Sequence, residues 1–191
     1  MRLCQRFDTT SLHRAGKKII LVNCSGSPIA LEPETKNCEA ILQAWYPGQA
    51  GGTAVADVLF GDYNPGGRLP VTFYRNMSQL PDFEDYNMTG RTYRYMTQQP
   101  LFPFGYGLSY TTFEYGNLSL AKEQIKVGEP LKLTVNVTNN GQRDGEEVVQ
   151  VYLKKQDDAE GPGKTLRAFK RVRIPAGKSV EVAFDLNGKE L

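Results

Sequence analysis

The sequence predicts a partial α/β domain followed by an all-β sandwich. Two observations carry this prediction. The first half contains short continuous apolar runs separated by Gly- and Pro-rich loops, whereas the final part alternates apolar and polar residues with period two. Continuous runs are typical of parallel strands buried on both faces, and alternation is typical of strands with one buried face. A chain of 191 residues has room for two small domains.

The first half contains two predicted buried strands, one helix and one edge strand. Residues 17–23 and 40–46 each include a continuous apolar run, so we interpret both as buried strands. Residues 53–60 are small or apolar and precede Gly61, which predicts a short helix with a glycine C-cap. Residues 68–73 alternate and include a proline, a pattern typical of an edge strand.

A long connector follows, with few periodic apolar positions and many aromatic rings. A structureless loop of this length is unusual inside a compact domain. We therefore expect the connector to lie against both neighbouring regions with its rings buried. These rings belong to Phe83, Tyr86, Tyr93, Tyr95, Phe102, Phe104, Tyr106, Tyr110, Phe113 and Tyr115.

The final part reads as a β-sandwich. Residues 131–138, 149–153 and 180–186 alternate clearly, and 118–121 and 169–174 supply two further predicted strands. An immunoglobulin-like sandwich has about seven strands, so we expect an incomplete one with uncovered edges. The predicted domain division is then 1–75 for the end of an α/β sandwich domain, 76–116 for the connector, and 117–191 for the β-sandwich.

Composition and charge exclude several classes of protein. The 23 basic and 21 acidic residues are scattered and give a net charge of +2, so no basic stripe predicts nucleic-acid binding. The longest apolar run, 19–22, is far too short to span a bilayer, so we expect no membrane partner. The three cysteines (Cys4, Cys24, Cys38) and the single histidine, His13, form no metal-ligand pattern, so we expect free thiols, no metal and no cofactor.

Several motifs resemble glycoside hydrolase family 3. They are AWYPGQAGG at 44–52, AVADVLFGDYNP at 54–65, GRLP at 67–70, YRY at 93–95, LFPFGYGLSYT at 101–111 and GEEVVQVY at 145–152. The resemblance covers residue 14 to the C-terminus and implies the end of an α/β sandwich domain followed by a fibronectin type III-like domain. The first twelve residues do not resemble the family, which fits a displaced start codon or a frameshift.

The resemblance implies the function of a longer parent enzyme. That enzyme carries an N-terminal TIM-like barrel and cleaves β-linked glucosyl or xylosyl units of oligosaccharides or glycosides by a retaining mechanism. The family's nucleophilic aspartate lies on the barrel, and its acid/base glutamate usually lies upstream of residues 17–23. We therefore expect no catalytic residue in this chain, no activity alone, and a periplasmic or secreted parent enzyme.

Trp45 is the one candidate substrate-binding residue. Its apolar face matches the C–H groups of a pyranose ring, and its indole N–H can donate a hydrogen bond. It lies at the end of a predicted strand, where ligands bind in α/β sheets. The alternative is a Trp45 packed between strand and helix, because tryptophan is highly buried on average.

Two further hypotheses stay open. A minimal hydrolase would use Glu32 or Glu34, although carboxylates flanking a proline are usually solvated turn residues. A non-enzymatic carbohydrate-binding or interaction module would need an exposed aromatic platform on the sandwich, for which Tyr152 and Phe169 are few. The remaining charged candidates are expected to be solvated or to brace the connector: Asp82, Glu84, Asp85, Arg91 and Arg94.

Overall fold

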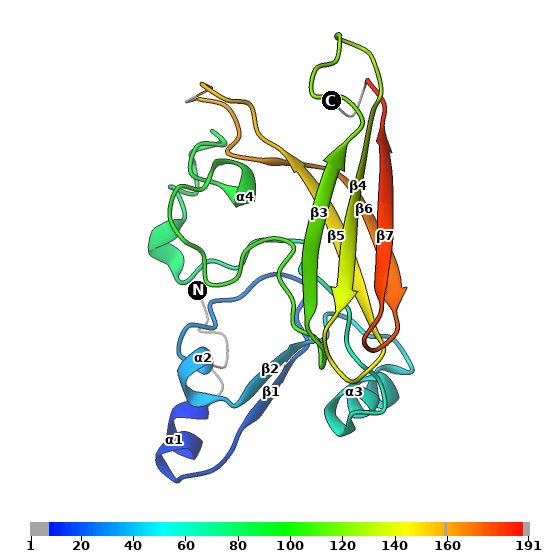
Figure 1. Cartoon of the computed structure of the whole chain (residues 1–191). Coiled ribbons are helices and arrows are strands. Elements are labelled where there is room, and N and C mark those ends of the chain that lie inside the picture. The colour runs from blue at the N-terminus through cyan, green and yellow to red at the C-terminus, as the bar shows by residue number, and fades with distance from the viewer. Residues whose placement is uncertain (1–7, 159, 189–191) are drawn as a thin grey trace.

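The computed structural model describes residues 8–158 and 160–188 and consists of two parts (Figure 1). An α/β part lies at one end of the molecule, and a β-sandwich extends away from it. The connector runs alongside the sandwich, and α3 lies at the base of the sandwich strands (Figure 1). The predicted fold class, an α/β part followed by an all-β sandwich, is therefore confirmed.

The α/β part is built around a two-stranded parallel sheet. β1 (Ile20–Asn23) pairs in register with β2 (Ala40–Gln43), as the two apolar runs predicted. Behind this sheet lies a small core in which Leu21, Leu31 and Phe73 are buried. A parallel sheet is normally covered on both faces, and this core covers one of them.

Three helices accompany the sheet. α3 (Gly51–Phe60) ends at Gly61, whose φ of +85° is the left-handed C-cap conformation, so the predicted helix and its cap are confirmed. Two short helices were not predicted: α1 (Thr9–Arg14), which Asp8 caps, and α2 (Glu34–Asn37). They contact each other and occur in stretches without apolar periodicity.

The prediction of an edge strand at residues 68–73 is wrong. Only Phe73 forms an isolated antiparallel bridge, and its partner is Phe102 in the connector. The Leu69 N–H also donates to a connector carbonyl, that of Tyr106, at 2.8 Å. The segment alternates because it packs against the connector, without joining a sheet.

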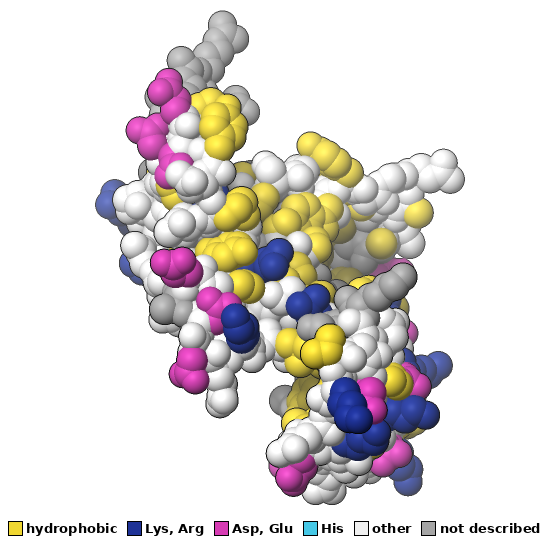
Figure 2. All heavy atoms as spheres, turned by 90° about the horizontal axis from the view of Figure 1, so that it is seen from above, with side chains coloured by type: hydrophobic (Ala, Val, Ile, Leu, Met, Phe, Trp, Pro, Cys, Tyr) yellow, Lys and Arg dark blue, Asp and Glu magenta, His cyan; other side chains and the backbone are white. Residues whose placement is uncertain are grey.

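The connector is partly structured and only partly buried. It contains η1 (Met77–Gln79) and α4 (Thr92–Tyr95). Tyr93 is half-buried, but Phe83 is 93% exposed and Tyr86 90% exposed, so the expectation that all its rings are buried is wrong. Both exposed rings lie on a turn that bonds mainly to itself. Figure 2 shows hydrophobic side chains exposed across the middle of the face seen from above.

The sandwich contains five strands in two antiparallel sheets, the number that the sequence predicted. One sheet has the order β3-β4-β7 and the other pairs β5 with β6. The predicted first strand at 118–121 is longer than expected, because β3 already begins at Phe113. The strands are β3 (Phe113–Leu120), β4 (Leu131–Asn139), β5 (Gly145–Leu153), β6 (Thr165–Ile174) and β7 (Ser179–Leu186).

The sandwich core lies between the two sheets. The alternating residues of β4 point inward, as the period-two pattern predicted. Asn139, at the end of β4, is fully buried, and its side-chain amide donates to the Arg143 and Ile174 carbonyl oxygens at 2.7 and 3.0 Å. The buried apolar core consists of Leu133, Val135, Val137, Val149, Ile174, Val182, Phe184 and Leu186.

β3 is an irregular and exposed edge strand. Every residue after Phe113 in this strand is exposed. Its pairing with β4 shifts register between Gly116 and Ser119, and Asn117 within this β-bulge has a φ of +50°. The bulge interrupts a strand that is otherwise free along one side.

Candidate functional site

A groove of about 610 Å³ runs along β2. One wall is β2 itself, and another is the end of α3. Residues 65–69 and the connector residues 106–110 also line the groove, together with side chains from the α2 region and from the small core. The lining is mostly apolar and includes Ile41, Leu42 and Trp45. A groove of this size is large enough for a small ligand or a short polypeptide segment.

Trp45 lines the groove and lies two residues after the end of β2. It is half-buried and contacts the Phe73 ring edge-on, with the ring centroids 6.2 Å apart. Its φ of +55° lies in the left-handed region, which is uncommon for a bulky residue and often occurs at functional sites. Trp45 therefore packs on the core and also lines the groove. Its contact with a saccharide stays a prediction.

Tyr46 is a better exposed aromatic at the same edge, and the sequence analysis missed it. Its side chain is 80% exposed. Its ring lies over Gly26, where a Cβ would be only 2.5 Å from a ring carbon. The signal was available, since Tyr46 ends one predicted strand, Gly26 follows the other, and the carboxyl ends of the two strands meet at one edge.

A polar network fixes the loops that follow the two strands. The Asn23 amide donates to the Gln43 side-chain oxygen at 2.6 Å and to the Ser25 hydroxyl at 2.9 Å. The Ser25 hydroxyl in turn donates to the Ser27 carbonyl oxygen at 2.9 Å. Asn23 is buried, with 2% of its surface exposed. The carboxyl edge of the sheet is therefore a defined surface with hydrogen-bonding groups beside two aromatic rings.

The two carboxylates suggested for a minimal hydrolase do not meet in the groove. Glu32 forms an ion pair with Arg75 at 3.6 Å, and Glu34 is 3% exposed on α2. The expectation that both are solvated turn residues is therefore wrong for Glu34, because α2 turns it inward. Neither glutamate lines the groove.

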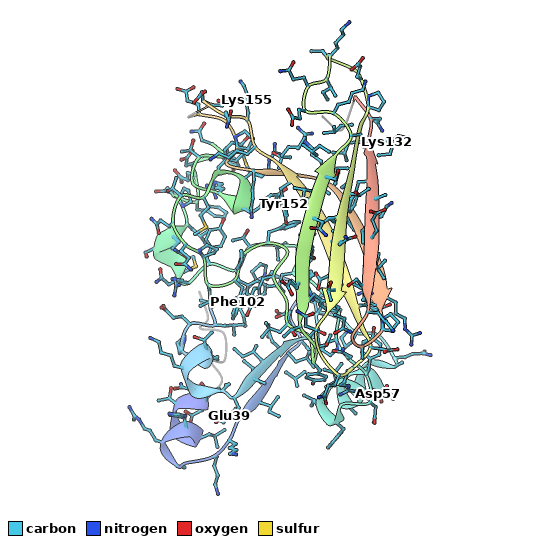
Figure 3. All side chains as sticks on the ribbon, in the orientation of Figure 1. Glu39, Asp57, Phe102, Lys132, Tyr152 and Lys155 are labelled. Atoms are coloured by element: carbon cyan, nitrogen blue, oxygen red, sulfur yellow. The ribbon has the colours of Figure 1, made fainter. Side chains whose placement is uncertain are left out.

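Acidic groups near the groove are dispersed. Glu39 is the one acidic residue among the described lining residues. In Figure 3, Glu39 lies beside α2 and Asp57 lies on α3, on opposite sides of the strand pair. A retaining glycosidase needs two carboxyl groups about 5 to 5.5 Å apart. The described part of the chain places no such pair in the groove.

The other charged candidates brace the connector. The Arg91 guanidinium donates to the Asn87 carbonyl oxygen at 3.0 Å, and it also donates to the Asp82 and Asp85 carbonyl oxygens. Arg94 lies over the Tyr95 ring at 5.6 Å. The bracing role predicted for these arginines is confirmed for Arg91, whereas the Arg94 side chain is exposed and, among the described residues, contacts only the ring of its sequence neighbour. The acidic run forms the exposed turn that Arg91 closes.

A buried ion pair joins the α/β part to the sandwich. Arg68 bonds Glu147 on β5, and their side chains are only 11% and 8% exposed. The Tyr115 hydroxyl donates to the other Glu147 oxygen at 3.0 Å. Partial desolvation of its hydroxyl group, together with the adjacent Glu147 charge, raises the pKa of Tyr115, although the residue as a whole is about half exposed. We call Arg68, Glu147 and Tyr115 the clasp; the sequence analysis did not predict it, although Arg68 and Glu147 lie within the quoted motifs.

Further contacts beside the clasp hold the same orientation. The Asn64 amide donates to the Asp144 carbonyl oxygen at 2.8 Å. The Asn64 side-chain oxygen accepts from the Ser109 hydroxyl at 2.8 Å and the Tyr110 N–H at 2.7 Å. One asparagine therefore ties the loop after α3 to both the connector and the sandwich.

The connector also covers the aromatic side chain that a carbohydrate-binding platform would need. Tyr93 stacks on Phe104 at 4.3 Å, and Tyr152 meets Tyr93 edge-on at 6.0 Å. Figure 3 shows Tyr152 beside α4. Burial, and to a lesser extent Tyr93, raises the pKa of Tyr152 to about 12. Phe169 is 65% exposed on β6, but one ring does not form a platform.

The described cysteines are free thiols. They are Cys24 and Cys38, whereas Cys4 lies outside the described residues. Within residues 8–158 and 160–188, no cluster of three or more His, Cys, Asp or Glu side chains could hold a metal ion. Over the same residues no helix is both long and apolar enough to span a membrane.

Fold and site together define a two-part protein in which an α/β domain carries a groove and a β-sandwich is clasped to that domain. The chain belongs to glycosyl hydrolase family 3: the model of the family's C-terminal domain matches residues 8–110. The model of a fibronectin type III-like domain matches residues 147–191. The family match includes residues 8–12, so the expectation that the first twelve residues lie outside the family is wrong.

Relatives of known name are β-glycosidases. A xylan 1,4-β-xylosidase of Xylanibacter ruminicola is 56% identical over 98% of this chain, and a periplasmic β-glucosidase of Salmonella typhimurium is 39% identical over 96%. The chain spans only 21% and 26% of these two relatives.

Solved structures agree with this assignment. A β-glucosidase from Erythrobacter marinus superposes with a TM-score of 0.82 at 40% identity, over 95% of this chain and 24% of that one. β-Glucosidase 3B from Thermotoga neapolitana superposes with a TM-score of 0.81 at 34% identity, over 96% and 28%.

Proposed function

We propose that this chain is the C-terminal, supporting part of a retaining β-glycosidase that hydrolyses β-glucosides or β-xylosides. The observation that carries the proposal is a family 3 chain whose groove holds aromatic and hydrogen-bonding groups but no carboxylate pair. In this proposal both catalytic carboxylates lie on other parts of the complete enzyme, and the chain alone is inactive. The division into residues 1–75, 76–116 and 117–191 is part of the same proposal.

The test is a fusion of this chain to the upstream region of one of its longer relatives. In a chimera, the upstream part of the Xylanibacter ruminicola relative precedes residue 8 of this chain. We expect the chimera to hydrolyse aryl β-xylosides or β-glucosides and the 191-residue chain to hydrolyse neither. Turnover by the chain alone that disappears in Glu32→Gln or Glu34→Gln would instead support the minimal hydrolase.

Trp45 is proposed as a saccharide contact within that enzyme. Its left-handed backbone conformation and its place in the lining of the groove support this role. In the chimera, Trp45→Ala should raise KM about tenfold, equivalent to about 1.4 kcal/mol, while Trp45→Phe, which keeps an aromatic face, should raise it less. Tyr46→Ala serves as the comparison at the same edge. An unchanged KM in Trp45→Ala with a lowered thermal midpoint would mean that Trp45 only packs on the core.

A further inference from the structure

A second pocket lies within the connector and shares no lining residue with the groove along β2. Its volume is about 240 Å³. Two segments line it: residues 78–81, which overlap η1, and residues 96–98, which follow α4. The pocket is smaller than one that encloses a drug-sized ligand, so a single sugar ring is the size of ligand that suits it. We call it the connector pocket.

The polar groups of the connector pocket are uncharged. Gln79 and Gln98 contribute side-chain amides, and Ser78 and Thr97 contribute hydroxyl groups. No lysine, arginine, aspartate or glutamate occurs among the described lining residues. Amides and hydroxyl groups both donate and accept hydrogen bonds. The lining therefore matches a neutral ligand with several hydroxyl groups.

Some of these groups are available to a ligand. Gln79 is held in place, because its side-chain oxygen accepts from the Arg75 N–H at 2.7 Å and its amide nitrogen donates to the Gln98 side-chain oxygen at 3.3 Å. This leaves the Gln98 amide nitrogen without a partner among the described residues, and the Thr97 hydroxyl has none there either. Both residues are exposed, so a ligand can reach these two groups from solvent.

A turn with two exposed aromatic rings begins and ends at the connector pocket. Pro81 and Gly90, which flank residues 82–89, both line the pocket, and a Cβ on Gly90 would lie 4.0 Å from the Pro81 ring. We call residues 82–89 the aromatic turn. Its rings, those of Phe83 and Tyr86, are almost fully exposed. Two apolar ring faces therefore lie on the segment that closes over the ends of the pocket lining.

The aromatic turn has a defined shape although its rings are exposed. The Arg91 guanidinium donates to three carbonyl oxygens of the turn. The Asp82 and Asp85 carboxylates each accept the backbone N–H two residues further on, at 3.1 and 2.8 Å. A turn that is already ordered loses little conformational freedom when a ligand binds to it.

We propose that the connector pocket and the aromatic turn form a saccharide-binding site for a neutral β-linked oligosaccharide. A ring face of the turn stacks on the C–H groups of a pyranose, and the amides and hydroxyl groups of the pocket bond its hydroxyl groups. The acidic residues of the turn disfavour an anionic ligand. The inference rests on the proposed function, because such oligosaccharides are the substrates of the proposed enzyme.

Binding of xylohexaose and cellohexaose to the 191-residue chain tests the inference. We expect a Kd on the order of 1 mM for at least one of them, with amide NMR shifts concentrated in residues 78–98. Phe83→Ala and Tyr86→Ala should each weaken binding about fivefold and leave the thermal midpoint unchanged, because both rings are exposed. Phe169→Ala is the matched control, since it removes an exposed ring from β6 and should leave the Kd unchanged.

Two further probes test the chemistry of recognition. Sorbitol carries hydroxyl groups but has no pyranose ring to stack, so it should shift the same amides about tenfold less readily. Sodium chloride should not change the Kd of the hexasaccharide, because neither partner contributes a charge to the contact. Equal binding of sorbitol, unchanged affinity in both ring variants, or no shift in residues 78–98 would each overturn the inference. Self-association of the chain that Phe83→Ala abolishes would overturn it too, because the rings would then contact a second copy.

The chimera decides the question if the chain alone shows no cooperative thermal transition. There the combined Phe83→Ala and Tyr86→Ala variant should raise KM for xylohexaose or cellohexaose about fivefold and leave KM for the aryl glycoside unchanged, because the aryl glycoside has only one sugar ring. An equal KM for the hexasaccharide in the variant and the parent chimera would refute the site.

The same measurements separate this inference from the proposed function. Hydrolysis of aryl glycosides by the unmodified chimera tests the function and does not depend on the aromatic turn. An active chimera with no contribution from Phe83 or Tyr86 would leave the proposed function standing and remove the site. An inactive chimera, together with saccharide binding to the chain that both ring variants weaken, would do the reverse.

Discussion

The sandwich and the α/β part differ in how far each encloses its own core. Strands of eight to ten residues surround eight buried apolar side chains in the sandwich. The α/β part has strands of four residues and three buried apolar side chains. Buried apolar area is the main favourable term in folding. The difference teaches that the sandwich buries enough apolar surface to be the more stable part, and that the α/β part depends on contacts with its neighbours for its stability.

Deleting one large core side chain from each part is the strongest way to test this contrast. Phe184→Ala should lower the free energy of unfolding by about 4 kcal/mol, because a cavity replaces a buried ring in the larger core. Phe73→Ala should leave the sandwich transition in place and speed amide exchange mainly in β1 and β2. Circular dichroism and hydrogen exchange measure both effects. If both variants show a single transition that is destabilised equally, the two parts unfold as one unit.

The clasp is the buried ion pair between the two parts, so removing one of its charges should have the next largest effect. Arg68→Met leaves Glu147 buried and unpaired, which should cost about 3 kcal/mol of stability in urea titrations. Adding Glu147→Leu should recover most of that loss, since an apolar pair often replaces a buried ion pair well. If the double variant is no more stable than Arg68→Met, the clasp does not act as a pair.

Two neighbouring glycines offer a smaller and closely controlled test of the same interface. A Cβ at Gly66 would lie 2.8 Å from the Glu146 carbonyl oxygen on β5, whereas a Cβ at Gly67 would meet no atom within 4 Å. Gly66→Ala should therefore push the two parts apart and cost about 2 kcal/mol. Gly67→Ala should be close to neutral. Similar thermal midpoints for the two variants would contradict the close approach of the backbones.

The smallest predicted effect lies within the sandwich and depends on pH. The Ala176 backbone N–H and the Arg173 guanidinium hold the pKa of Asp144 below its usual range. A carboxylate with a lowered folded-state pKa stabilises the fold above its unfolded pKa of about 4, and this contribution disappears as the pH falls. Asp144→Asn should therefore be less stable than the parent at pH 7.

The two proteins should converge in stability as the pH falls through the lowered pKa of Asp144, because the carboxylate is then protonated in the folded protein as well. Urea titrations at pH 7 and at an acidic pH below that pKa measure this convergence. Asp185→Asn is a suitable control because Asp185 is exposed and forms only a 3.6 Å ion pair with Lys132. A constant difference between Asp144→Asn and the parent at the two pH values would contradict the predicted role.

The sequence predicted elements whose local pattern matches their surroundings. The alternation of residues 131–138 identified β4, and the glycine after residues 53–60 identified the end of α3. Residues 68–73 alternate equally well, yet they pack on the connector. The alternation of apolar and polar residues indicates which side chains of a segment are buried. It does not indicate which other segment pairs with its backbone.

The site was less predictable than the fold, because it is made by contacts distant in sequence. Trp45 was recognised from its type and its position, but Tyr46 was not. The clasp joins residues 79 positions apart, and no local signal links them. The burial of Glu34 had no local signal either, because it lies on α2, a short helix without a periodic pattern in the sequence.

The bulge in β3 bears on how molecules of this protein behave toward one another at high concentration. A straight, exposed edge strand is a template onto which a strand from a second molecule can pair, and repeated pairing leads to aggregation. The register shift between Gly116 and Ser119, with Asn117 at positive φ, breaks the row of regularly spaced N–H and C=O groups that such pairing requires. The irregularity thereby protects the most exposed strand of the sandwich from self-association, although Leu118 and Leu120 leave it apolar.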